Sequence, residues 1–273
     1  MPKFGFLVVE GPHDVEFAYR LLTPFGLKRV ANERQLDPLF RLLIPRDYPP
    51  GGDLQKRMPT PLFVSSGTHT LAIQSAIGDT RLVQTVEENL AQVSSTNLAG
   101  LGIVLDADKD KAVSAGARYD AIRTRMATID LQLPDAAGTV TAGSPRLGAF
   151  VLPNNAASGT LEDLLLDCAT TVYPSLLDSA TKHADGAATD RTLTADDLQD
   201  FHKPAGRNKA VIGAMASVLR PGKAIQVSIQ DNRWLRGETL LLPRIKAVQD
   251  FLVALFEIES PTAPPLAAPP VNP

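Results

Sequence analysis

Residues 4–14 read FGFLVVEGPHD, a short apolar run that ends at a glutamate and a glycine. A run of this length that is apolar at every position is typical of a strand buried on both faces of a parallel sheet. Pro12 then suits the first turn of a helix, and apolar residues at helical spacing extend that helix towards Pro24 or Gly26. The segment therefore predicts a strand–turn–helix unit with Glu10 at the carboxyl end of the strand.

Further strands and helices alternate along the first half of the chain. Strands are predicted at 62–65, 101–105 and 147–152, and helices at 36–43, 69–77, 79–93 and 112–129. This alternation indicates βαβ crossovers between parallel strands. The predicted fold class is α/β, a Rossmann-like core with a mostly parallel four-stranded sheet flanked by helices, plus a helical C-terminal extension.

The domain organisation follows from changes in composition. The α/β core is expected to span 1–158, and within it 28–61 is rich in proline and reads as an insertion or flap rather than core. The part from 159 to 258 is expected to complete the core and the site, with helices at 160–168, 171–183, 194–201, 207–219 and 243–257. Residues 259–273 are rich in proline and are predicted to be a disordered tail.

The composition excludes several classes of protein. The chain is 44% hydrophobic and 21% charged, which excludes a fibrous or wholly disordered protein. It has no run of roughly 20 apolar residues and no signal-peptide pattern at its start, so we expect a cytoplasmic protein without membrane contact. The single cysteine, Cys168, excludes an internal disulfide and a zinc site built on several thiolates. With a net charge of -3, any contact with nucleic acid must be local or metal-assisted.

Acidic residues follow the predicted strands at 4–9 and 101–105 and recur after the strand at 147–152. Ligands of an open parallel sheet bind beyond the carboxyl ends of its strands, so these residues should converge on one edge. Packed together without a cation they would raise one another's pKa, and oxygen ligands favour Mg²⁺ or Mn²⁺. The candidate ligands are Glu10, Asp14, Asp106, Asp108, Asp110, Glu162 and Asp163, and the strand at 62–65 would bring Ser65, Ser66 and Gly67 to the same edge.

Simpler roles stay open for some of these residues. Asp14 and Asp110 are also typical of turn formers and helix caps. Glu162 and Asp163, at the start of a predicted helix, could serve only to complement its dipole. His13 is either a substrate contact or a surface histidine at the start of its helix, and none of the 4 histidines has zinc-ligand spacing.

A basic run lies in the C-terminal half. Between 203 and 223 there are basic residues and no acidic one, a pattern that fits either a solvated helix face or a phosphate-facing patch. Lys209 lies in an apolar helix and is the best placed to stabilise charge on a scissile phosphate. The candidate nucleic-acid-binding residues are Lys203, Arg207, Arg220, Lys223 and, near Trp234 and Arg236, Arg233.

Two motifs of the chain resemble the Toprim domain. The first is a strand ending in Val-Glu-Gly at 9–11 with Asp14 four residues after Glu10, and the second is Asp106-x-Asp108 after a later strand. The Toprim domain is shared by topoisomerases, primases, ribosomal-RNA maturases and overcoming-lysogenization-defect (OLD) nucleases. The segments 150–154, 159–165, 209–210 and 221–223 resemble a stand-alone Toprim-related family, DUF3226.

The resemblance implies phosphoryl transfer with two metal ions, Mg²⁺ or Mn²⁺. Asp106 and Asp108 would hold them, Glu162 and Asp163 would complete the site, and Glu10 would bind metal or act as general acid/base. Lys209 matches the late lysine of OLD-type nucleases. The expected partners are nucleic acid, a separately encoded ATPase (because the chain has no P-loop) and a second copy of the chain.

The chain also departs from the Toprim pattern. Lys109-Asp110-Lys111 stands where Toprim proteins usually have a glycine soon after the second aspartate, and 28–61 lengthens the spacing from Glu10 to Asp106.

Three functions are therefore weighed. The first is a Mg²⁺-dependent nuclease acting on DNA or RNA, with anti-phage defence as the context that the family suggests. The second is a non-catalytic module that binds nucleic acid or an ATPase. The third is an aspartyl phosphatase. In such enzymes the Asp-x-Asp motif usually follows the first strand and is succeeded by Thr or Val, whereas here it follows the third predicted strand and is succeeded by Lys109.

Overall fold

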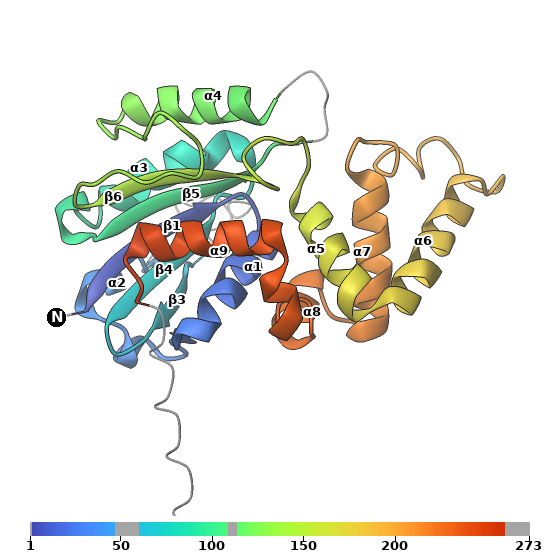
Figure 1. Cartoon of the computed structure of the whole chain (residues 1–273), viewed down its shortest axis with the longest axis horizontal. Helices are drawn as coiled ribbons and strands as arrows, with labels where there is room; N and C mark the ends of the chain where they lie inside the picture. Colours follow the sequence, from blue (N-terminus) through green and yellow to red (C-terminus); the bar gives the residue numbers. More distant parts are fainter. Residues whose placement is uncertain (1, 47–59, 109–113, 260–273) are drawn as a thin grey trace, which may run out of the picture.

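The computed structural model describes residues 2–46, 60–108 and 114–259, as an α/β fold with helices on both faces of a mixed sheet (Figure 1). The strands are β1 (Lys3–Val9), β2 (Lys28–Arg29), β3 (Leu62–Ser65), β4 (His69–Ser75), β5 (Gly100–Asp106) and β6 (Arg146–Leu152). The helices are α1 (Pro12–Leu22), α2 (Pro38–Arg41), α3 (Leu82–Leu90), α4 (Ala115–Ala127), α5 (Leu161–Val172), α6 (Pro174–Ala188), α7 (Gly206–Leu219), α8 (Ile225–Asp231) and α9 (Pro243–Phe256). Short 3-10 turns lie at Thr23–Phe25, Glu33–Gln35, Asp79–Arg81, Ser95–Asn97 and Gly237–Leu241.

The α/β class is confirmed, but the sheet differs from the predicted one. In the part of the chain that the structure describes it has 6 strands in the order β2-β3-β4-β1-β5-β6. Strand β1 pairs in parallel with β4 and β5, and β5 pairs in parallel with β6. Strand β3 runs antiparallel to both β4 and β2.

The helix predicted at 69–77 is wrong, because this segment forms β4. Its residues are buried at almost every position, as in a central strand. A tight hairpin joins it to β3, with the Ser66 amide donating to the His69 carbonyl at 2.8 Å. Since β3 is antiparallel, Ser65, Ser66 and Gly67 lie at the amino ends of the parallel strands, and the expectation that they join the acidic edge is wrong as well.

The C-terminal half is helical, with two departures from the predicted pattern. Residues 194–201 form turns instead of a helix, and the sequence pattern did not predict α8. Helix α9 packs on β1, β5 and β6, whereas α5, α6 and α7 pack together beside the sheet (Figure 1). Among the described residues no helix is both long and apolar enough to cross a membrane. Of the predicted tail, 259–273, only Glu259 is among the described residues.

Alternation along the strands divides the core between the two faces of the sheet. In β1, Leu7 and Val9 face one cluster with α1, α5 and α9, whereas Phe6 and Val8 face another with α3 and α4. Successive side chains of a strand thus point to opposite faces of the sheet, and both faces are buried, as expected for a parallel sheet covered by helices.

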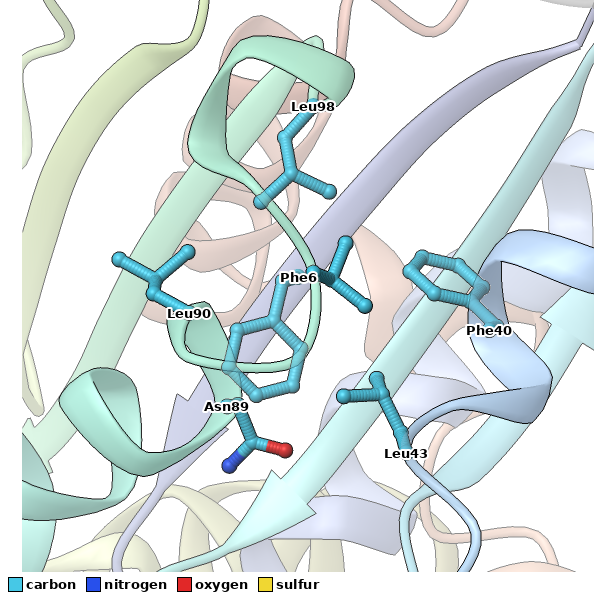
Figure 2. A pocket seen from close by; sticks show the side chains of 7 residues that line it. Phe6, Phe40, Leu43, Asn89, Leu90 and Leu98 are labelled. Atoms are coloured by element: carbon cyan, nitrogen blue, oxygen red, sulfur yellow. The ribbon is translucent and has the colours of Figure 1, made fainter.

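The described part of 28–61 contributes to this second cluster. Leu36, Phe40 and Leu43 are buried in it, so the expectation that this segment lies outside the core is wrong for these residues. Phe40 packs edge-on against Phe4, with 5.5 Å between ring centroids. Figure 2 shows Phe6, Phe40, Leu43, Leu90 and Leu98 converging around a space that has no room for a water molecule. Residues 47–59, which belong to the same predicted insertion, lie outside the described residues.

The substitution Phe40→Ala is expected to lower the free energy of unfolding by about 3 to 5 kcal/mol, because it removes a fully buried ring and leaves a cavity. Leu42→Ala, two residues away, is the matched control, since Leu42 is 56% exposed and should change stability by less than about 0.5 kcal/mol. Urea denaturation of both variants measures the difference. Equal stability of the two variants would contradict the packing of this segment onto the sheet.

Candidate acidic site

Four carboxylates lie close together at the carboxyl ends of β1 and β5. Glu10 follows β1, Asp106 is the last residue of β5, Asp14 lies in the first turn of α1, and Glu162 lies in the first turn of α5. The charges of Asp14, Glu10 and Glu162 all act on Asp106. We call these four residues the acidic cluster; they confirm the predicted convergence for this part of the edge.

Glu10 is held in place by two N–H donors. Its Oε1 accepts hydrogen bonds from the Asp106 backbone amide at 3.0 Å and from the Arg118 guanidinium at 3.2 Å. Burial raises the pKa of Glu10 to about 7, against the opposing effects of the Asp106 amide and Arg118. Glu10 therefore exchanges its proton near neutral pH.

Asp106 joins the strand to the start of α5. Its Oδ1 accepts a hydrogen bond from the Leu161 amide at 2.9 Å, one of the helix's otherwise unpaired N–H groups. Burial, and then the charges of Asp14, Glu10 and Glu162, raise the pKa of Asp106 well above its ordinary value. The fold thus fixes a carboxylate where its negative charge is disfavoured unless a cation is present.

Asp14 and Glu162 are the most enclosed members of the cluster. The Oδ2 of Asp14 accepts the Gly11 amide at 3.0 Å, and burial followed by the charges of Glu10 and Glu162 raises the pKa of Asp14 to about 7. Glu162 is only 7% exposed, and its buried Oε2 has no hydrogen-bond partner among the described residues. An unpaired carboxylate oxygen in such surroundings is unfavourable and calls for a cation or water.

Sequence reasoning missed Arg118, which borders the cluster from α4. Its guanidinium contacts Asp79 Oδ2 at 2.9 Å, Glu10 Oε1 at 3.2 Å and Asp108 Oδ2 at 3.5 Å, and its Nε donates to the Asp106 carbonyl. Arg118 lies on α4, the next helix after the strand that ends at Asp106. This place in the chain was the only feature of the sequence that could have indicated a role for Arg118 at the cluster. Arg118 partly neutralises the outer side of the acidic edge.

The remaining predicted acidic ligands lie in different settings. Asp108 has a φ of 64°, its carbonyl accepts the Gly159 amide at 2.8 Å, and its side chain is 52% exposed beside Arg118. Asp163 caps α5, with Oδ2 accepting from the Thr160 amide and Oδ1 from the Asn208 side chain, both at 2.9 Å. Asp163 therefore forms part of the N-terminal cap of α5, a structural role at the helix start where the simpler interpretation had it complement the dipole. Asp110 lies outside the described residues.

The donor set is compatible with a hard divalent ion, although it does not form a complete cage. Among the residues with described positions, no group of three or more His, Cys, Asp and Glu side chains is placed to hold a metal ion. Mg²⁺ is commonly bound by one or two carboxylates, with water and substrate phosphates filling the other positions. The unpaired Oε2 of Glu162 and the mutual repulsion of the cluster both fit such a partial site.

His13 lies within electrostatic reach of both Glu162 and Lys209. His13 hydrogen-bonds to Gln226, and burial together with the charge of Lys209 lowers the pKa of His13, whereas Glu162 opposes this. Lys209 is exposed on α7. The predicted lysine is therefore within electrostatic reach of His13, at the cluster's α7 side.

Three residues of the predicted basic run are paired with acids that lie outside the run. Lys203 contacts Asp200 at 2.5 Å, Arg207 contacts Asp185 at 2.7 Å, and Arg220 contacts Asp231 at 3.3 Å. Arg233 donates to the Val172 carbonyl at 3.2 Å and lies over the Tyr173 ring, while Lys223 is exposed. The run therefore carries less free positive charge than its sequence suggests.

Comparisons with known proteins give one family match and one similar solved structure. Residues 5–257 match the family model described as "Protein of unknown function (DUF3226)". A crystal structure of a hypothetical protein from Pyrococcus horikoshii OT3 is similar, with a TM-score of 0.48 and 14% sequence identity, over 93% of this chain and 95% of that one. None of the curated proteins matches the chain.

Proposed function

This chain belongs to the DUF3226 family, whose function is unknown, and from its acidic cluster we propose that it is a Mg²⁺-dependent nuclease of the Toprim type. The observation that carries the proposal is the enclosed set of Glu10, Asp14, Asp106 and Glu162 at the carboxyl edge of the parallel strands. Burying several carboxylates close together destabilises the fold, because their charged forms are desolvated and repel one another. Such clusters occur mainly at functional sites, where catalysis or ligand binding requires them.

The metal-holding residues in this proposal are Asp106 and Glu162, with Asp108 at the open side. When bound, divalent ions supply positive charge at the phosphate and make a water molecule more acidic. Glu10 would hold the proton on Oε2, since its Oε1 accepts both N–H groups, and burial raises its pKa to about 7 in the ion-free protein. General acid–base work at neutral pH needs a group whose pKa lies in this range. Arg118 would orient Glu10, and Lys209 would stabilise charge on the phosphate.

A second candidate is a non-catalytic module that binds nucleic acid or an ATPase through the same edge. The finding that favours it is that, in the described part of the chain, no three potential ligands are placed to hold a metal. Such a module needs no positioned water.

Supercoiled plasmid, single-stranded DNA and structured RNA, each incubated with the protein in Mg²⁺, Mn²⁺ or EDTA, separate these candidates. We expect cutting of at least one substrate with Mg²⁺ or Mn²⁺ and none with EDTA. Retarded migration of intact substrate under all three conditions would instead support the binding module and refute the nuclease.

A further inference from the structure

A group of arginines lies along the helix that starts at the acidic cluster. Helices α1 and α8 pack side by side (Figure 1). Asp14 of the cluster lies near the start of α1, and Arg20 comes six residues later, which is about 9 Å along a helix. Arg20 therefore lies further along the same helix that carries one of the cluster's carboxylates.

Two more arginines join Arg20 from other segments. The guanidinium of Arg29 is ion-paired with Glu16, one turn before Arg20, and lies over the Tyr19 ring at 4.8 Å. Arg20 donates to the Leu235 carbonyl at 3.5 Å, next to Arg236. Arg236 in turn donates to the Asp231 carbonyl at 3.1 Å, at the end of α8. We call Arg20, Arg29 and Arg236 the arginine cluster.

The arginine cluster has more positive charge than its surroundings neutralise. Glu16 is already paired with Arg29, and the nearby Asp231 is paired with Arg220. Burial lowers the pKa of Arg20, and the like charges of Arg236 and Arg29 lower it further. Arg29 is compensated by Glu16, whereas Arg20 and Arg236 donate to backbone carbonyls, so the cluster keeps a net positive charge that favours binding of an anion.

This setting differs from that of the predicted basic run. Lys203 and Arg207 each have a carboxylate partner of their own, at 2.5 Å and 2.7 Å. In the arginine cluster, Arg20 and Arg236 donate to backbone carbonyls, which orient a guanidinium without cancelling its charge. The arginine cluster is therefore the stronger phosphate-binding surface near the site.

We propose that the arginine cluster binds the phosphates of a nucleic-acid strand that runs along α1 and α8 and enters the acidic cluster. The proposal rests on the proposed function, because that function supplies the reason for a strand at the acidic edge. Six helical residues put Arg20 about 9 Å further along the axis of α1 than Asp14, which gives the axial offset between the two clusters. Arginine donates in pairs to phosphate oxygens, so three of them would fix the strand's position without reading its sequence.

The test measures binding without cleavage. Fluorescein-labelled 20-nucleotide single-stranded DNA, single-stranded RNA and duplex DNA are titrated with the full chain in EDTA, and anisotropy is followed from 50 to 200 mM NaCl. The triple variant Arg20→Gln/Arg29→Gln/Arg236→Gln should bind the preferred probe at least about tenfold more weakly, with a salt slope smaller by about two to three. The single variant Arg236→Gln, at an exposed position, should reduce the slope by about 0.7 to 0.9 even if the triple variant folds poorly.

A control variant removes the same charge elsewhere. Lys182, Lys246 and Arg123 are exposed and ion-paired with Asp178, Asp250 and Asp135, so Lys182→Gln/Lys246→Gln/Arg123→Gln should bind as wild type does. Equal losses in the two triple variants, an unchanged salt slope in Arg236→Gln, or no binding of any probe by wild type at 50 mM NaCl would each overturn the proposal.

The two proposals fail separately. Wild type that binds through the arginine cluster but cuts nothing with Mg²⁺ or Mn²⁺ refutes the nuclease and keeps the binding surface. Wild type that cuts, together with a triple variant that binds and cuts equally well, refutes the binding surface and keeps the nuclease.

Discussion

Asp106→Asn is expected to reduce metal-dependent cleavage by about 10³-fold or more, the loss typical of removing a central group of a metal-assisted site. Asparagine keeps an oxygen that can accept the Leu161 amide, so the link between β5 and α5 should persist. The substitution removes the negative charge of the residue whose pKa is raised by the charges of Asp14, Glu10 and Glu162. The loss is therefore expected in the rate of cutting and not in the amount of folded protein.

Initial cleavage rates on the preferred substrate, with circular dichroism to verify folding, measure this effect. Asp163→Asn is the matched control, because Asp163 caps α5 and bonds to Asn208. The Asp163→Asn variant should cut at a rate within about tenfold of wild type. A loss of this size is at the lower end of what is typical when a residue that only supports the metal ligands is changed. Undiminished cutting by Asp106→Asn would remove the acidic cluster from the mechanism.

Protein stripped of divalent ions is expected to lose stability relative to Asp14→Asn as the pH rises from 5 to 8. The folded-state pKa of Asp14 is raised from 3.8 to about 7. Such a group stabilises the fold fully below pH 3.8, and this contribution is lost as the pH rises through about 7. Between pH 5 and 8 the advantage of the asparagine variant should grow by about 3 kcal/mol, since asparagine does not ionise and can still accept the Gly11 amide.

Urea denaturation of both proteins in EDTA at pH 5 and pH 8 gives this difference directly. Adding Mg²⁺ at pH 8 should restore part of the stability of wild type, because a bound ion offsets the same repulsion. The prediction is contradicted if the difference between Asp14→Asn and wild type is the same at both pH values.

The elements around the site were predictable where local pattern and tertiary setting agree. The apolar run of β1, followed by Glu10 and by a proline that suits the start of a helix, is typical of a buried strand that leads into a helix. The segment 69–77 was not predictable in this way, because a short apolar run fits a buried strand and a buried helix equally well. Its misassignment also hid the antiparallel direction of β3 and so misplaced Ser65, Ser66 and Gly67.

The acidic cluster was predictable because Glu10 and Asp106 lie at the ends of strands and Asp14 and Glu162 lie in the first turns of helices that follow strands. The carboxyl ends of parallel strands meet at one edge of the sheet. Contacts between segments distant in sequence were not predictable. Arg118 reaches Glu10 across 108 positions, and Asp185 and Asp231 neutralise Arg207 and Arg220 from outside the basic run. The sequence alone therefore overstated the charge of that run and missed the arginine cluster, whose three members come from three separate segments.

Binding of Mn²⁺ tests the central claim, that the acidic cluster holds a divalent ion, most directly. Mn²⁺ is titrated into metal-free wild type and Asp106→Asn at pH 7.5, and the free ion is followed by electron paramagnetic resonance. Saturable binding by wild type, with release of protons and loss of the binding in Asp106→Asn, is the predicted result. Absence of binding by wild type, or equal binding by both proteins, would contradict it.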